Sequence, residues 1–193
     1  MVIGKSLDRK RYEIVKVARL PGDGDWSEIS QMLRQYNCKS GVIDIRPYES
    51  AARRFQTEHK LRIFLCEYSE SSTVSRAFNT KTGIVKVNRT EICDDSHSLI
   101  AEDGRLTIPR ISPEIREFAK QVCDPAKSLE INKNTKIGVY RYRGKEDHYR
   151  HALNYFMLAV GKIGFAQKSH DGGYDWSRRP QTGKKVMNEY QRI

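Results

Sequence analysis

Three acidic residues stand where carboxylates that hold a metal ion or activate water are often found. Asp44 lies near the end of the short apolar run Gly41–Ile45, and Glu146 and Asp147 form a pair just before a long amphipathic stretch. An isolated carboxylate in a buried strand is costly, so Asp44 needs a partner or a metal ion. The alternative is that Asp44 caps the turn before Pro47. The carboxyl ends of strands in α/β sheets carry functional sites, which slightly favours the functional reading.

The other acidic and histidine pairs have simpler explanations open to them. Glu146–Asp147 lies in the expected first turn of a helix, where acids gain from the helix dipole without any further role. His148 and His151 are three residues apart on that helix, but no further His or Cys nearby would complete a zinc site. Asp94–Asp95 is expected to lie on a solvated helix face.

The charge of the chain favours a polyanionic partner. The 193 residues include 35 Lys and Arg against 24 Asp and Glu, which gives a formal net charge of +11 at pH 7. Two segments concentrate the basic residues: residues 1–20 hold six against two acids, and residues 125–151 hold seven against three. Such clusters are typical of nucleic-acid binding, although a solubilising basic face would have the same composition.

The order of the expected elements predicts an α/β fold. Apolar runs alternate with helical periodicity from the first strand onward, and two pairs of short strands read as β-hairpins. Residues 1–165 are expected to form one domain and residues 166–193 a flexible basic tail. The expected strands are Val2–Leu7, Tyr12–Leu20, Gly41–Ile45, Leu61–Tyr68, Val74–Phe78, Ile84–Val87, Leu106–Ile108, Leu129–Ile131 and Ile137–Tyr142. The expected helices are Asp25–Tyr36, Tyr48–His59, Glu91–Ala101, a helix starting at Ser112-Pro113, and Glu146–Ile163.

Several classes of protein are disfavoured. No apolar run approaches the length of a membrane span, and the N-terminus does not resemble a secretory signal. The cysteines lack any C-x-x-C pair, so they are expected to be free, buried thiols in a reducing compartment. They are Cys38, Cys66, Cys93 and Cys123.

Three segments in order resemble the nuclease domain of the large terminase subunit of tailed bacteriophages. The first is Val42–Phe55, an apolar strand ending in Asp and followed by a proline turn into a helix. The second is Ile100–Pro109, which resembles the link from a helix into a short strand. The third is Gly144–Tyr155, an acidic pair at the start of a helix with an Ala-Leu-x-Tyr continuation. The resemblance covers roughly residues 2–163.

The resemblance implies a ribonuclease H-like mixed sheet flanked by helices, and an endodeoxyribonuclease that cuts concatemeric double-stranded DNA during packaging. It implies hydrolysis at two divalent ions, Mg²⁺ or Mn²⁺, with Asp44, Asp147 and Glu146 as ligands. The family usually has Asp-Asp at the last helix, so Glu146 is a departure. The family's first strand, with its catalytic Asp, is expected to precede the opening hairpin, and Val2–Leu7 aligns best with the second strand.

The resemblance also implies partners and a location. These are double-stranded DNA, a terminase ATPase domain, the small terminase and the portal protein, in the host cell cytoplasm during virus assembly, with no membrane. The residues expected to contact DNA are Arg46, Arg76, Lys81, Lys86, Arg141, Arg143 and Lys145. Two alternatives stay open: a non-catalytic DNA-binding or motor-docking module with an incomplete metal site, and another ribonuclease H-like enzyme such as a resolvase or ribonuclease.

Overall fold

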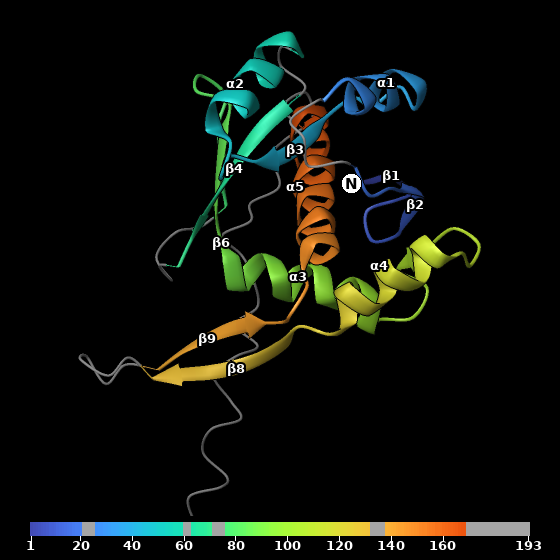
Figure 1. Cartoon of the computed structure of the whole chain (residues 1–193), viewed down its shortest axis with the longest axis vertical. Helices are drawn as coiled ribbons and strands as arrows, with labels where there is room; N and C mark the ends of the chain where they lie inside the picture. The colour runs from blue at the N-terminus through green and yellow to red at the C-terminus, as the bar shows by residue number, and fades with distance from the viewer. Residues whose placement is uncertain (21–25, 60–62, 71–75, 132–137, 169–193) are drawn as a thin grey trace, which may run out of the picture. The chain divides into compact units, whose positions relative to one another are not determined.

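The computed structural model of the chain describes residues 1–20, 26–59, 63–70, 76–131 and 138–168, with the backbone alone for residues 162–168. These residues form five helices and nine strands (Figure 1). The strands are β1 (Val2–Ser6), β2 (Tyr12–Val17), β3 (Gly41–Asp44), β4 (Ile63–Ser69), β5 (Ala77–Asn79), β6 (Ile84–Asn88), β7 (Leu106–Thr107), β8 (Ala126–Ile131) and β9 (Gly138–Arg143). The helices are α1 (Ser27–Gln35), α2 (Glu49–Glu58), α3 (Arg89–Ala101), α4 (Pro113–Cys123) and α5 (His148–Lys168).

The largest sheet has the strand order β3-β4-β6-β5. Strands β3 and β6 both run parallel to β4, and β5 returns antiparallel to β6. In the register of this sheet Asp44 lies beside Cys66 of β4. The hairpin predicted for β5 and β6 is therefore confirmed, and the mixed sheet agrees with the predicted α/β class.

The two faces of this sheet are covered by different helices. Val42 packs in one core cluster with Leu158 of α5, whereas Ile45 packs in another with Ala52 of α2. Because side chains alternate along a strand, Asp44 shares the face of Val42 and points toward α5. The contact of Asp44 with Tyr155 of α5 agrees with this alternation.

A second sheet has the order β1-β2-β7 and packs against α4 and α5. Ile14 of β2, Phe118 of α4 and Leu153 of α5 lie in its core cluster. Helix α5 therefore contributes side chains to the core clusters of both sheets (Figure 1). Among the described residues, β1 pairs only with β2 and β3 pairs only with β4. One edge of each of these strands carries no strand partner there.

The third sheet is the β8–β9 hairpin, which was also predicted. The hairpin rests on α3, where the Thr90 hydroxyl donates to the Tyr140 carbonyl at 2.8 Å. Next to it, the guanidinium of Arg150 is buried and donates to the backbone carbonyls of Val122 at 2.7 Å and Cys93 at 2.9 Å. The Arg150 side chain therefore connects α3 and α4 to α5, the helix that follows Asp147.

Helix starts follow the sequence rules in one case and depart from them in another. Helix α4 begins as predicted, with the Ser112 side chain accepting from the Ile115 N–H at 3.2 Å and proline in the first turn. Helix α5 begins at His148, two residues later than predicted, so Glu146 and Asp147 precede it. The predicted helix start at Asp25, the predicted strand start at Ile137 and nearly all of the predicted tail lie outside the described residues.

The predicted class is confirmed only at its coarser level. The fold is α/β with mixed sheets and two hairpins, and its strands are divided among three sheets. The thiols differ from the expectation in part, since Cys66 and Cys93 are buried but Cys38 is half-buried and Cys123 is exposed. Cys123 is exposed because it ends α4 on the side away from the core. None of the described helices has the length and apolarity needed to cross a membrane.

Candidate functional site

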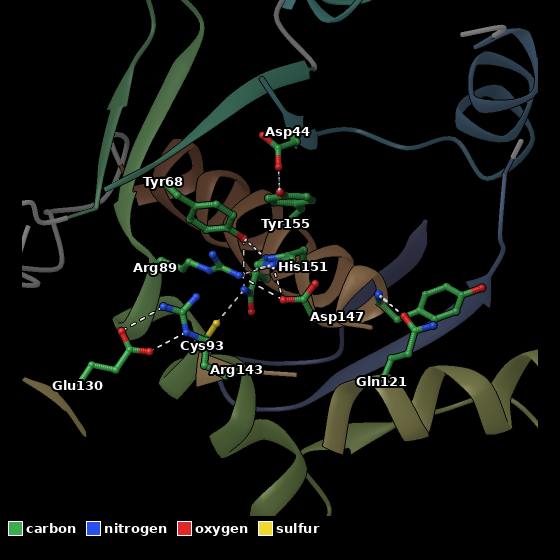
Figure 2. Close-up of polar contacts among 12 residues, drawn as sticks. Asp44, Tyr68, Arg89, Cys93, Gln121, Glu130, Arg143, Asp147, His151 and Tyr155 are labelled. Atoms are coloured by element: carbon green, nitrogen blue, oxygen red, sulfur yellow. Dashed lines mark hydrogen bonds and ion pairs between the residues drawn. The ribbon is translucent and has the colours of Figure 1, made fainter. Parts of the chain in front are cut away.

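Asp44 is held by two hydrogen bonds, one local and one from α5. Its Oδ1 accepts the N–H of Arg46 at 2.9 Å, which closes the turn after β3. Its Oδ2 accepts the hydroxyl of Tyr155 at 2.6 Å (Figure 2). Asp44 therefore caps the turn before Pro47, as the structural interpretation of the sequence expects. It also faces α5, the helix that follows the second acidic motif.

Asp147 lies immediately before α5 and shares one oxygen between two partners. Its Oδ2 is 3.2 Å from Nε2 of His151, one helical turn later, and 3.2 Å from a terminal guanidinium nitrogen of Arg89. Arg89 is the first residue of α3 and also lies 3.1 Å from His151 Nε2. Arg89, Asp147 and His151 thus form a closed polar group (Figure 2).

His151 connects this group to the aromatic hydroxyls. Its Nδ1 lies 3.0 Å from the hydroxyl of Tyr68 on β4, and the same hydroxyl accepts from the Asn154 side chain at 3.3 Å. Burial lowers the pKa of His151, while the negative charges of Asp147 and Asp44 oppose that shift. Asp147 contacts this imidazole ring directly, whereas Asp44 is connected to it through Tyr155, whose ring stacks with that of His151 at a centroid distance of 6.4 Å.

The two tyrosines of the site are hydrogen-bond donors rather than acids. Burial is the main cause that raises the pKa of Tyr68 and of Tyr155 well above the usual range. Both hydroxyls thus stay protonated at neutral pH, so that the Tyr155 hydroxyl is a permanent donor to Asp44.

Glu146, the third predicted carboxylate, is not part of this group. Its Oε2 accepts from the side-chain amide of Gln121 on α4 at 3.2 Å. Gln121 is itself buried and accepts the Tyr149 backbone N–H at 3.1 Å, which fixes its orientation. The structure thus brings Asp44 and Asp147 to one face of α5, and directs Glu146 toward α4.

Most of the predicted DNA-contacting residues already have acidic partners. Arg76 pairs with Asp95, Lys86 with Glu67 at 3.3 Å, and both Arg141 and Arg143 with Glu130. Three others form no ion pair among the described residues: Arg46, Lys81 and Lys145. These three are the cations of the predicted set that are most available to a phosphate backbone.

Asp94 and Asp95 are partly exposed on α3, as the predicted solvated helix face implies, but both also form ion pairs. Both oxygens of Asp94 accept from Lys127, at 2.9 and 2.7 Å, and its Oδ1 also accepts the Tyr142 hydroxyl at 2.8 Å. Asp95 accepts from Arg76 at 2.5 Å. The pair therefore attaches the β8–β9 hairpin and the segment before β5 to α3.

The sequence reasoning missed Arg89, Tyr68 and Tyr155, and weighed His151 only as a zinc ligand. The sequence did contain a signal for His151 and Tyr155. Together with Asp147 they are spaced at intervals of four residues, so the three share one helix face. Arg89 and Tyr68 come from other elements, and no local pattern marks them.

The site does not fit a two-metal centre as the side chains are arranged. No group of three or more His, Cys, Asp or Glu side chains among the described residues could hold a metal ion. Asp44 already has two donors, and the Oδ2 of Asp147 is taken by Arg89 and His151. The need for Mg²⁺ or Mn²⁺ stays a prediction. Comparisons with protein-family models, curated proteins and solved structures give no match for this chain.

Proposed function

We propose that this chain is a DNA-cleaving domain of a viral packaging terminase, an endonuclease that hydrolyses phosphodiester bonds of double-stranded DNA. The observation that carries the proposal is the convergence of Asp44 and Asp147. They lie far apart in the sequence and in two of the three motifs that suggest the terminase, yet Asp147 contacts His151, and Asp44 is hydrogen-bonded to Tyr155, whose ring stacks with that of His151. Carboxylates that meet at a strand end and a helix start are typical of sites that cleave phosphodiester bonds.

The charge distribution supports a nucleic-acid substrate. The net charge of +11 favours association with a polyanion. Arg46 follows Asp44 by two residues and Lys145 precedes Asp147 by two, so each carboxylate has a cation close to it in the chain. Cations beside a carboxylate centre can hold the phosphate backbone in position while the acids act on the scissile group.

Mg²⁺ or Mn²⁺ belongs to this proposal as an expectation from the family resemblance. A divalent ion would stabilise the charge that develops on the phosphate. No step is derived through it, because the arrangement described does not gather three ligands. What the chain's own residues do is defined: Tyr155 orients Asp44 and His151 orients Asp147. The same proposal includes three protein partners, which are the terminase ATPase domain, the small terminase and the portal. It also places the action of the protein in the host cytoplasm.

The test is nicking of supercoiled plasmid by the full chain in the presence of Mn²⁺. Asp44→Asn and Asp147→Asn should each lower the rate by at least about a hundredfold, because each removes a charge from the reacting centre. Glu146→Gln should have a smaller effect, since its carboxylate faces Gln121. Asp103→Asn, a change at an exposed acid in the turn after α3, is the matched control and should leave the rate unchanged. Unchanged nicking in either of the first two variants would overturn the assignment.

A second candidate is a non-catalytic DNA-binding or motor-docking module. The specific observation in its favour is that Asp147 is already neutralised by an ion pair with Arg89. This candidate predicts salt-sensitive binding of duplex DNA with a steep dependence on ionic strength, together with no cleavage and no Mn²⁺ uptake in calorimetry. Cleavage that depends on both Asp44 and Asp147 would exclude it.

A further inference from the structure

Helices α1 and α2 form the walls of a groove with a volume of about 380 Å³. Along both helices the lining covers most of the length, and it consists of Trp26, Ser27, Ser30, Arg34, Ala51, Arg54, Phe55 and Glu58. Neither Asp44 nor Asp147 lines it, so the groove is separate from the candidate site described above. Small-molecule sites usually measure about 300–1,000 Å³, so this groove has room for one small molecule or one unit of a polymer.

Two arginine side chains in the groove are available to a ligand. Arg34 and Arg54 are both exposed, and neither forms an ion pair with another residue in the described part of the chain. By contrast, Arg53, the neighbour of Arg54 on α2, lies 3.7 Å from the carboxylate of Glu49. The lining contains a single acid, Glu58, against the two arginines. The groove therefore carries an excess of positive charge and favours an anionic group.

Trp26 gives one wall of the groove an aromatic surface. Its ring meets that of Phe55 at a centroid distance of 5.1 Å and an interplanar angle of 74°. Because Phe55 is buried in the core, this contact fixes the position of the indole before any ligand is present. The Ser30 hydroxyl is also held in place, 2.8 Å from Nε2 of His59. The groove thus combines a pre-positioned flat ring with hydroxyl and guanidinium groups.

We propose that the groove between α1 and α2 binds a nucleoside phosphate, with the phosphate between Arg34 and Arg54 and the base against Trp26. Guanidinium groups recognise phosphate through charge-assisted hydrogen bonds that are often bidentate, and aromatic side chains contact the faces of bases. A free nucleotide and one unit of a single nucleic-acid strand present the same chemistry. The inference goes beyond the proposed function, because this binding requires neither of the two carboxylates.

The test follows the fluorescence of Trp26 in the full chain carrying Trp176→Phe, which leaves a single tryptophan. The probes are deoxyadenosine 5′-monophosphate and a ten-residue oligodeoxyadenylate, both without divalent metal. At least one of them should quench the fluorescence in a saturable manner. Arg34→Gln and Arg54→Gln should each weaken this binding by at least about tenfold, because each removes a charged donor to phosphate. Arg116→Gln removes the same charge from an exposed position of α4 and should leave the binding unchanged.

The two probes distinguish the two sources of the ligand. Quenching by the mononucleotide assigns the groove to free nucleotides, whereas quenching by the oligonucleotide alone assigns it to a nucleic-acid strand. Inorganic phosphate should displace the bound probe only at concentrations at least about tenfold higher than those of the probe, because it lacks the base.

Three results would overturn the inference: no quenching by either probe, equal weakening by Arg116→Gln and Arg34→Gln, or displacement by inorganic phosphate at the concentration of the probe. Thermal melting shows whether each variant is folded, and Arg54→Lys covers the case in which a glutamine variant is not. Arg54→Lys keeps the charge but loses the planar donor pair, so it should weaken binding by a smaller factor than Arg54→Gln. Plasmid nicking tests the proposed function separately, since these variants leave Asp44 and Asp147 unchanged.

Discussion

Asp94 on α3 and Asp147 before α5 belong to two similar acidic pairs, but they are bound in different ways. Asp94 uses both oxygens and receives three hydrogen bonds at 2.7 to 2.9 Å from Lys127 and Tyr142. Asp147 shares one oxygen between Arg89 and His151 at 3.2 Å. The side chain of Asp94 is the more exposed of the two, at 43% against 29%. The two acids therefore differ in the number and length of their hydrogen bonds, and the more closely bound one is not the more deeply buried one.

The comparison shows that a pair of adjacent acidic residues in a sequence can have either of two roles. Two adjacent acids in or beside a helix are common, and their role depends on what the other elements bring to them. The β8–β9 hairpin brings Asp94 a lysine and a tyrosine, and these attach the hairpin to α3. Helices α3 and α5 bring Asp147 an arginine and a histidine that share the same oxygen. We interpret Asp94 as a structural anchor of the β8–β9 hairpin and Asp147 as part of the candidate functional site.

The largest effect expected from this comparison is on the stability of the hairpin anchor. Asp94→Ala should lower the free energy of unfolding by about 1–2 kcal/mol, because it leaves Lys127 and the Tyr142 hydroxyl without their partner. Asp147→Asn should lower it by less than about 1 kcal/mol, as for a partly exposed ion pair. Urea denaturation measures both, with Asp103→Ala as the control.

Hydrogen exchange sharpens the same test. In Asp94→Ala the amides of β8 and β9 should lose protection before those of β4, because the hairpin is attached through its contacts with α3. A larger loss of stability in Asp147→Asn than in Asp94→Ala would reverse the comparison and make Asp147 the structural anchor.

An intermediate effect is expected at Tyr155. Tyr155→Phe removes the 2.6 Å hydrogen bond to Asp44 and should lower the free energy of unfolding by about 1 kcal/mol, because the donor is half-buried and its acceptor is a carboxylate. Tyr140→Phe is the matched control, since the exposed Tyr140 hydroxyl has no hydrogen-bond partner among the described residues. Equal melting temperatures for the two variants would mean that Asp44 does not depend on α5.

The smallest expected effect is the pH dependence contributed by His151. Burial lowers its pKa, so the unfolded chain binds a proton at a higher pH than the folded chain does. Stability should therefore fall as the pH is lowered through the ordinary titration range of histidine, and the loss should level off below the folded pKa. His151→Gln should flatten this part of a plot of melting temperature against pH. A curve that His151→Gln leaves unchanged would show that another group is responsible.

Local patterns predicted much of the fold and part of the site. Strand alternation places Val42 and Asp44 on one face of β3 and Ile43 and Ile45 on the other, and the two faces pack in different core clusters. The start of α4 at Ser112-Pro113 follows from capping chemistry. These predictions succeed because strand alternation and helix capping depend on neighbours in the chain.

The rest depends on contacts between elements that no local pattern encodes. Nothing in the sequence around Arg89 indicates that it meets Asp147, or that Tyr68 meets His151. Arg141 and Arg143 were predicted as DNA contacts from their charge alone, but Glu130 on the paired strand β8 forms a diagonal ion pair with each of them. A count of charges cannot distinguish a free cation from one that a cross-strand partner neutralises.

The separation of the two larger sheets has a consequence for how the protein behaves at high concentration. Strands β1 and β3 each have an edge that pairs with no other strand in the described part of the chain, and such an edge presents backbone donors and acceptors in register for another chain. β3 is apolar up to its last residue, Asp44, whereas β1 contains Lys5, a residue that discourages strand-to-strand association. Self-association, where it occurs, should therefore begin along β3, close to Asp44, and a soluble preparation would need that edge shielded.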